Sequence, residues 1–236
     1  MELPQGALPR YERDVAAVAT VISRRGGVPE QIMEGEEVIV PLFEIAARPT
    51  VRLSEIKARR FYIVDRAQIK AKEALQKEED TNILNALIAS AVNNGNQITN
   101  NVGNLTPNAL NAAFRDIEQH DLVATKIVVH ARQFASIRMF GKEFFDEATQ
   151  REIITTGLYG HFFTADIHVS SRMNADMVLV VASPDTVGVF PIRQDITVLP
   201  ADDPVRLRLG WVIYEEVGIA IMNDYAVSLI DVTAST

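Results

Sequence analysis

The hydrophobic pattern changes along the first third of the chain, and each change marks a different predicted element. Residues 1–27 hold one short stretch of helical periodicity, 12–22, which a Gly-Gly pair follows. From 28 to 64, β-forming residues dominate two runs, 38–45 and 51–64, on either side of a proline. We therefore expect an N-terminal arm and then an extended two-stranded hairpin. An isolated hairpin is only marginally stable in water, so it needs a surface to lie on.

The strongest helical pattern covers residues 65–92. The segment contains neither glycine nor proline, and its leucine, isoleucine and alanine residues keep the spacing of one helical stripe. At 1.5 Å per residue, this helix would be a rod of roughly 40 Å. The Asn- and Gly-rich segment that follows it, 93–106, is typical of turns and loops.

Helices and strands alternate less regularly in the rest of the chain. Thr106 and Pro107 have the residue types of a helix N-cap and first helical position. The predicted elements are helices over 106–117 and 131–140, and strands over 126–130, 165–169, 177–181, 187–190, 205–213, 217–221 and 226–232. The pattern predicts an α+β fold with an antiparallel or mixed sheet.

Composition narrows the class of protein. The chain has 236 residues, 47% of them hydrophobic, which is enough for a folded core. Cysteine is absent, which excludes disulfides, thiolate metal sites and a thiol nucleophile. The net charge of −8 argues against tight binding to nucleic acid through its phosphates, but not against enclosing nucleic acid.

The charge is unevenly distributed. Eight basic and two acidic residues between 48 and 72 give that segment a charge of +6, which leaves −14 for the rest. Its candidate contact residues are Arg48, Arg52, Lys57, Arg59, Arg60 and Arg66. The candidate acidic surfaces on a neighbouring copy are Glu34, Glu36 and Glu37, then Glu78, Glu79 and Asp80, and also Asp202 and Asp203. Complementary patches of this kind set the register of an assembly. A solvated charged face and a nucleic-acid patch are the alternatives.

Catalytic motifs are missing from the sequence. It contains no nucleotide-binding glycine motif, no HExxH and no GxSxG. The four histidines, at 120, 130, 161 and 168, are more typical of structural roles than of a metal site. Glu78, Glu79 and Asp80 cannot converge on one substrate, because adjacent helical residues point in different directions. We expect neither an enzyme nor a metal or other cofactor.

The order of these elements resembles the major capsid protein of tailed bacteriophages with the Hong Kong 97-type fold. The resemblance rests on order and spacing, and includes the segments LTPNALNAAFRDIEQHDL, KIVVHARQFASIRMF and GHFFTADIHVSSRM. It implies an arm, an extended β-hairpin loop, a long spine helix, a peripheral lobe and an axial lobe. The implied ranges are 1–27 for the arm, 28–64 for the loop, 65–122 with 192–236 for the peripheral lobe, 65–92 for the spine helix within it, and 123–191 for the axial lobe.

The resemblance also implies a function. Such proteins assemble as hexamers and pentamers into an icosahedral shell around double-stranded DNA, without sequence-specific binding. The implied partners are further copies of the chain, with scaffold, portal and decoration proteins as candidates, and no membrane. The implied location is the virion, assembled in the bacterial cytoplasm. An encapsulin, which shares the fold and encloses cargo enzymes, is the first alternative. A monomeric enzyme or ligand-binding domain with an unrecognised site is the second.

Overall fold

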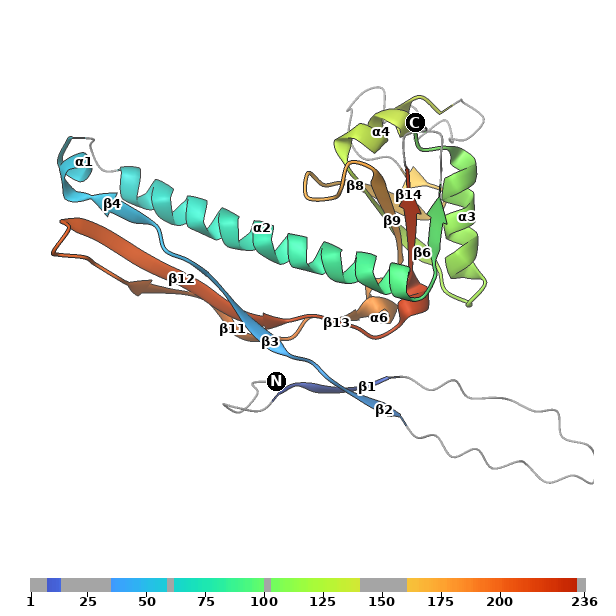
Figure 1. The fold of residues 1–236 in the computed structure, drawn as a ribbon, viewed down its shortest axis with the longest axis horizontal. Coiled ribbons are helices and arrows are strands. Elements are labelled where there is room, and N and C mark those ends of the chain that lie inside the picture. The colour runs from blue at the N-terminus through green and yellow to red at the C-terminus, as the bar shows by residue number, and fades with distance from the viewer. Residues whose placement is uncertain (1–7, 14–34, 59–61, 100–102, 141–160, 233–236) are drawn as a thin grey trace, which may run out of the picture.

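The molecule has an elongated half and a compact half, joined along one helix (Figure 1). The computed structural model describes residues 8–13, 35–58, 62–99, 103–140 and 161–232. We call the elongated half the long lobe and the other half the compact lobe. The long lobe is a helix lying on a narrow sheet, and the compact lobe is a wider sheet covered by shorter helices.

Helix α2, Tyr62–Asn93, runs through both lobes and confirms the predicted spine helix, although it begins three residues earlier than expected. Its first half buries Ala71 and Leu75 in the core of the long lobe. Its second half buries Leu84 and Leu87 in the core of the compact lobe. The helix ends at Asn93, and Gly95 in the turn after it has a φ of 74°, in the left-handed region that glycine adopts without strain.

The sheet of the long lobe is built around one long strand, β12, Arg208–Gly218. Strand β11, Ile192–Pro200, pairs with one edge of β12. Strands β3, Leu42–Ala47, and β4, Thr50–Arg52, pair with the other edge. All these pairings are antiparallel, and alternate side chains of β12 point toward α2.

The structure corrects the predicted hairpin. In their described residues, the runs 38–45 and 51–64 do not pair with each other, because β3 and β4 lie along β12 instead, and residues Leu53–Ala58 form helix α1. Burial explains the difference, since β12 offers β3 an apolar surface that an isolated hairpin would lack.

A separate two-stranded antiparallel pair joins β1, Arg10–Arg13, to β2, Glu36–Ile39. One of its strands thus comes from the segment predicted as the arm. The chain leaves this pair at Arg13 and returns to it at Glu36.

The compact lobe contains a six-stranded sheet in the order β5-β14-β9-β6-β8-β7. Helix α3, Pro107–Glu118, packs on it, and Thr106 caps that helix by accepting a hydrogen bond from the backbone nitrogen of Ala109 at 3.3 Å. Helix α4, Ala131–Arg138, follows β6. The strands are β5 Gln97–Thr99, β6 Ala124–Val129, β7 His161–Phe162, β8 Ala165–Val169, β9 Met177–Ala182 and β14 Val227–Asp231.

The two lobes are not single stretches of the chain. Helix α3, which lies within 65–122, and strand β14, which lies within 192–236, both belong to the compact lobe. Strand β14 lies between β5 and β9, so its place is set by pairing with partners that are distant in sequence. A short ribbon of β10, Gly188–Val189, and β13, Ala220–Ile221, lies between the two lobes.

Candidate functional site

The free end of the long lobe is formed by two corners of the chain that contact each other. One corner is the turn between β11 and β12, and the other is the junction of β4 with α1 (Figure 1). The backbone nitrogen of Leu53 donates a hydrogen bond to the carbonyl oxygen of Leu207 at 3.0 Å, which ties the corners together. Within the turn, Asp203 Oδ1 accepts a hydrogen bond from the backbone nitrogen of Arg206 at 3.2 Å.

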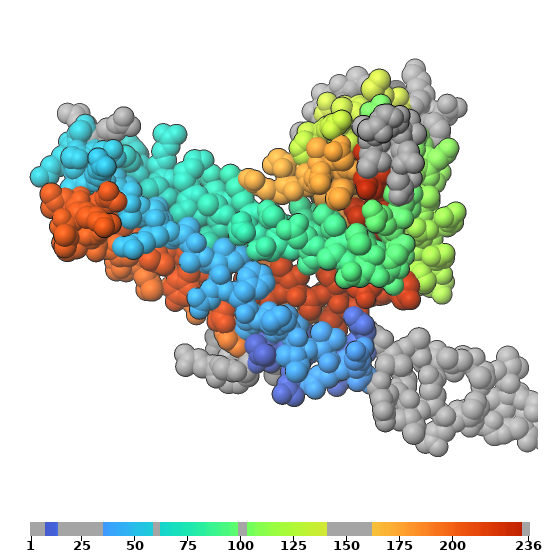
Figure 2. All heavy atoms as spheres, in the orientation of Figure 1, coloured from blue at the N-terminus to red at the C-terminus, as the bar shows by residue number. Residues whose placement is uncertain are grey.

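This end of the molecule carries a cluster of basic side chains. They come from both corners and line one cavity of about 570 Å³. We call this surface the basic tip, and define it by Arg52, Lys57, Arg206 and Arg208 with the neighbouring Val205 and Leu207. Figure 2 shows the two corners in contact at the narrow end of the molecule.

The charge of the basic tip is only partly compensated within the chain, because its four cations share the turn with two carboxylates, Asp202 and Asp203. Arg206 lies 3.8 Å from Asp203, in a pair whose arginine side chain is 71% exposed, so this pair contributes little stability. Within the described residues, Arg52, Lys57 and Arg208 make no ion pair. Two apolar side chains are exposed beside these cations: Val205 is 91% exposed and Leu207 is 64% exposed.

The predicted basic residues do not all meet here. Arg52 and Lys57 line the tip cavity, while Arg48 and Arg66 are exposed elsewhere, in the turn between β3 and β4 and near the start of α2. Arg59 and Arg60 lie outside the described residues. Arg206 and Arg208 were not predicted as contact residues, because the alternation of residues 205–213 indicates a regular strand. The available signal in the sequence was two arginines that alternate with the apolar residues Val205 and Leu207.

Two of the predicted acidic residues are already paired within the chain. Glu37 lies 3.1 Å from Arg10, and Glu36 lies 3.6 Å from Arg13, across the β1–β2 pair. Glu34 lies outside the described residues. Asp202 accepts a hydrogen bond from the backbone nitrogen of Gly210, so it stabilises the turn at the tip rather than forming a separate acidic surface.

A second acidic surface lies along the side of the long lobe. Glu78 on α2 and Glu44 on β3 are exposed, and both line a groove of about 430 Å³ between these elements. Its apolar lining includes Phe43, Ala47 and Leu75. We call this surface the acidic groove. Asp80 is exposed but does not line it.

Beneath α2, the sheet buries a carboxylate that the sequence analysis did not single out. Glu215 on β12 is 4% exposed and lies between the buried positions Ile213 and Val217. Its Oε1 atom has no hydrogen-bond partner. Burial raises the pKa of Glu215, and the nearby charges of Glu79 and Asp195 raise it further. Burial also raises the pKa of Glu79, with a contribution from Asp80.

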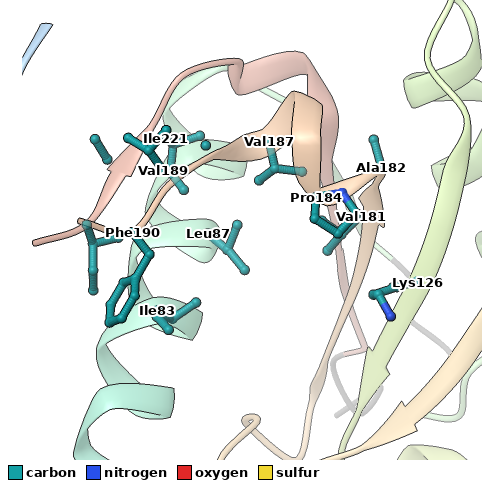
Figure 3. Close-up of a pocket in the computed structure, with 13 residues that line it drawn as sticks. Ile83, Leu87, Lys126, Val181, Ala182, Pro184, Val187, Val189, Phe190 and Ile221 are labelled. Atoms are coloured by element: carbon teal, nitrogen blue, oxygen red, sulfur yellow. The ribbon is translucent and has the colours of Figure 1, made fainter. Parts of the chain in front are cut away.

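The apolar pocket at the junction of the lobes offers little chemistry (Figure 3). It has a volume of about 220 Å³ and includes Ile83, Leu87 and Phe190 in its lining. Lys126 is the one charged residue in that lining, and its Nζ lies 3.3 Å from His168 Nε2. The lining holds no carboxylate or hydroxyl that could form an acid–base or nucleophilic pair with this lysine.

Other polar groups of the described chain have structural roles. His120 stacks against Tyr225 with ring centroids 4.1 Å apart. His130 caps α4 by accepting a hydrogen bond from the backbone nitrogen of Arg132. Among the described residues, no three histidine, aspartate or glutamate side chains are grouped so that they could hold a metal ion. None of the described helices is long and apolar enough to cross a membrane.

Comparisons with known proteins identify the fold. No family model matches the chain, and no curated protein sequence matches it significantly. Among solved structures, the capsid of cyanophage P-SCSP1u matches with a TM-score of 0.72 at 9% identity, covering 100% of this chain and 86% of that one. A chain of Mycobacterium phage Bobi matches with a TM-score of 0.68 at 13% identity, covering 98% of this chain and 87% of that one.

A chain of the holo-SrpI encapsulin complex from Synechococcus elongatus PCC 7942 also matches, with a TM-score of 0.63 at 13% identity, covering 100% of this chain and 85% of that one. These likenesses extend over nearly the whole chain. The molecule therefore has the Hong Kong 97-type fold that phage capsid proteins and encapsulins share, as the sequence resemblance implied.

Proposed function

We propose that this protein is the major capsid protein of a tailed phage, which assembles through hexamers and pentamers into an icosahedral shell around double-stranded DNA. The observation that carries this proposal is the match of nearly the whole chain to the cyanophage capsid structure. The shell would be part of the virion and would assemble in the bacterial cytoplasm. Its partners would be other copies of the chain, with scaffold, portal and decoration proteins as further candidates.

The division of the molecule fits this role. We infer that the long lobe, with α2 as its spine, is the peripheral lobe of the fold, and that the compact lobe is the axial lobe. The β1–β2 pair would form the base of the extended loop. This assignment replaces the boundaries expected from sequence, which placed the loop at 28–64.

Copies of the chain would contact one another mainly through oppositely charged surfaces and exposed apolar side chains. The basic segment with Arg48, Arg52, Lys57, Arg59, Arg60 and Arg66 would face acidic surface of a neighbouring copy. Glu78 is the best-placed acidic residue, because it lines the acidic groove, is exposed and makes no ion pair among the described residues, whereas Glu36 and Glu37 are paired within the chain.

An encapsulin shell that encloses cargo enzymes is the second candidate, and the match to the SrpI complex over the full length of the chain supports it. The two candidates differ in what the particle contains. We therefore expect particles isolated from the native source to hold nuclease-protected double-stranded DNA and to carry a tail at one vertex. Particles that hold enzymes, and neither DNA nor a tail, would overturn the phage proposal in favour of an encapsulin.

A further inference from the structure

We propose that the basic tip of one copy inserts into the acidic groove of a second copy, so that the long lobes meet end to side. This inference rests on the proposed shell function and names a specific contact within it. It requires that the tip keep a fixed shape, that the groove accept that shape and charge, and that the two surfaces cannot meet within one chain.

The tip is a preformed structure rather than a loose loop. Asp203 and Arg208 exchange backbone hydrogen bonds of 2.9 and 3.0 Å across the base of the turn. Leu207 has a φ of 51°, which is unfavourable for a side chain of this kind. The fold nevertheless holds Leu207 in this conformation and exposes 64% of it. A strained and exposed apolar residue at a fixed turn indicates an interaction surface.

The groove offers the complementary surface. Phe43, Ala47 and Leu75 provide apolar contacts in its lining, while Glu44 and Glu78 provide negative charge. No lysine or arginine is among the residues that line it. Val205 and Leu207 of the tip could bury apolar surface in the groove, while the flanking arginines meet the two glutamates.

The chain cannot make this contact with itself. The tip lies at the end of the molecule where α2 begins, at Tyr62, whereas Glu78 is sixteen residues further along that rigid helix. At 1.5 Å per residue, the two surfaces are about 24 Å apart. The contact is therefore between different surfaces of two copies, and such heterologous contacts generate rings or extended lattices.

A charge exchange tests the contact. We expect the tip variant Arg52→Glu/Arg208→Glu and the groove variant Glu44→Lys/Glu78→Lys each to reduce the yield of assembled particles by about tenfold or more, because like charges would then meet. The four substitutions in one chain should restore assembly, since the exchanged charges again attract. The control for the tip variant is Lys72→Glu/Arg172→Glu, which changes the net charge by the same amount at exposed positions outside both surfaces.

A disulfide trap gives an independent measurement that does not depend on reversed charges. Because the chain has no cysteine, Val205→Cys/Ala74→Cys places one thiol at the tip and one in the groove. Oxidised particles should give a ladder of covalent oligomers on denaturing gels. The matched control, Val205→Cys/Ala89→Cys, uses an exposed alanine of the same helix outside the groove and should give little ladder.

The outcomes separate this inference from the shell function. Normal assembly of both charge-reversed variants, or equal ladders from the two cysteine pairs, would overturn the tip-in-groove contact while wild-type particles still supported a shell. A wild-type chain that forms no particles would overturn the shell function and the contact together.

Discussion

At the scale of single residues, Glu215 is the least expected feature of the described chain. Among the described residues it is the one acidic or basic residue that is buried, and its Oε1 atom has no hydrogen-bond partner. The charged groups that act on it are Glu79 on α2 and Asp195 on β11, and both are acidic. Each of these features disfavours its charged form, so its pKa is raised.

The raised pKa has a defined effect on stability. An acid whose pKa is higher in the folded state binds its proton more tightly there, so folding is favoured at low pH. Stability then falls as the pH rises from the unfolded-state pKa, about 4.3, to the folded-state pKa. We therefore expect Glu215→Gln to stabilise the protein at pH 7 by about 1–3 kcal/mol, since an uncharged group is less costly to bury without a partner.

Urea unfolding at pH 7 and near pH 4 measures this effect, and the advantage of Glu215→Gln should shrink at the lower pH. Glu216→Gln is the matched control, because Glu216 is adjacent and forms a 2.7 Å ion pair with Arg193. Its substitution should destabilise the protein at pH 7. An equal gain in unfolding free energy for Glu215→Gln at both pH values would show that the charge of Glu215 is not the cause.

At the scale of elements, the ribbon of β10 and β13 between the lobes depends on one close backbone approach. A Cβ atom at Gly188 would lie 2.3 Å from the carbonyl oxygen of Ala220 and 3.0 Å from the Cα of Ile221. Both neighbours are backbone atoms of the paired strand, so neither can rotate away.

We therefore expect Gly188→Ala to destabilise the protein by about 1–3 kcal/mol, as overpacking of a closely fitted site does. The measurement is the midpoint of thermal or urea unfolding. Gly35→Ala is the control, since its Cβ would come no closer than 3.6 Å to any neighbour and should leave the midpoint nearly unchanged. A similar loss from both variants would contradict the role given to this ribbon.

The elements also show which parts of the structure the sequence could predict. The spine helix and the start of α3 were predictable, because helical spacing and the Thr106–Pro107 cap are local signals. The pairing of β3 with β12 was not predictable, because those strands are more than 150 residues apart. Their composition identifies them as strands but does not distinguish a distant partner from a neighbour in sequence.

The same limit applies to the candidate site. Arg52 and Lys57 stood out because they belong to a dense basic segment. Arg206 and Arg208 join them only because the chain turns back between β11 and β12. That turn uses Leu207 in a left-handed conformation, where turn-forming residues such as glycine or asparagine would have been recognised from sequence.

At the scale of the whole molecule, the two cores differ greatly in extent. The core of the compact lobe brings together side chains from α2, α3, α4 and the six-stranded sheet. Among the described residues, the core of the long lobe contains five buried residues, with four partly buried neighbours. A long lobe with so small a core has much of its surface free for contacts with other copies, as the proposed shell requires.

The most direct test of the shell function is electron microscopy of the purified wild-type protein. The account predicts closed icosahedral shells, or rings of five and six subunits, in which long lobes contact neighbouring copies. A protein that stays monomeric in sedimentation over a wide range of salt and protein concentration, and gives neither shells nor rings on the grid, would contradict it.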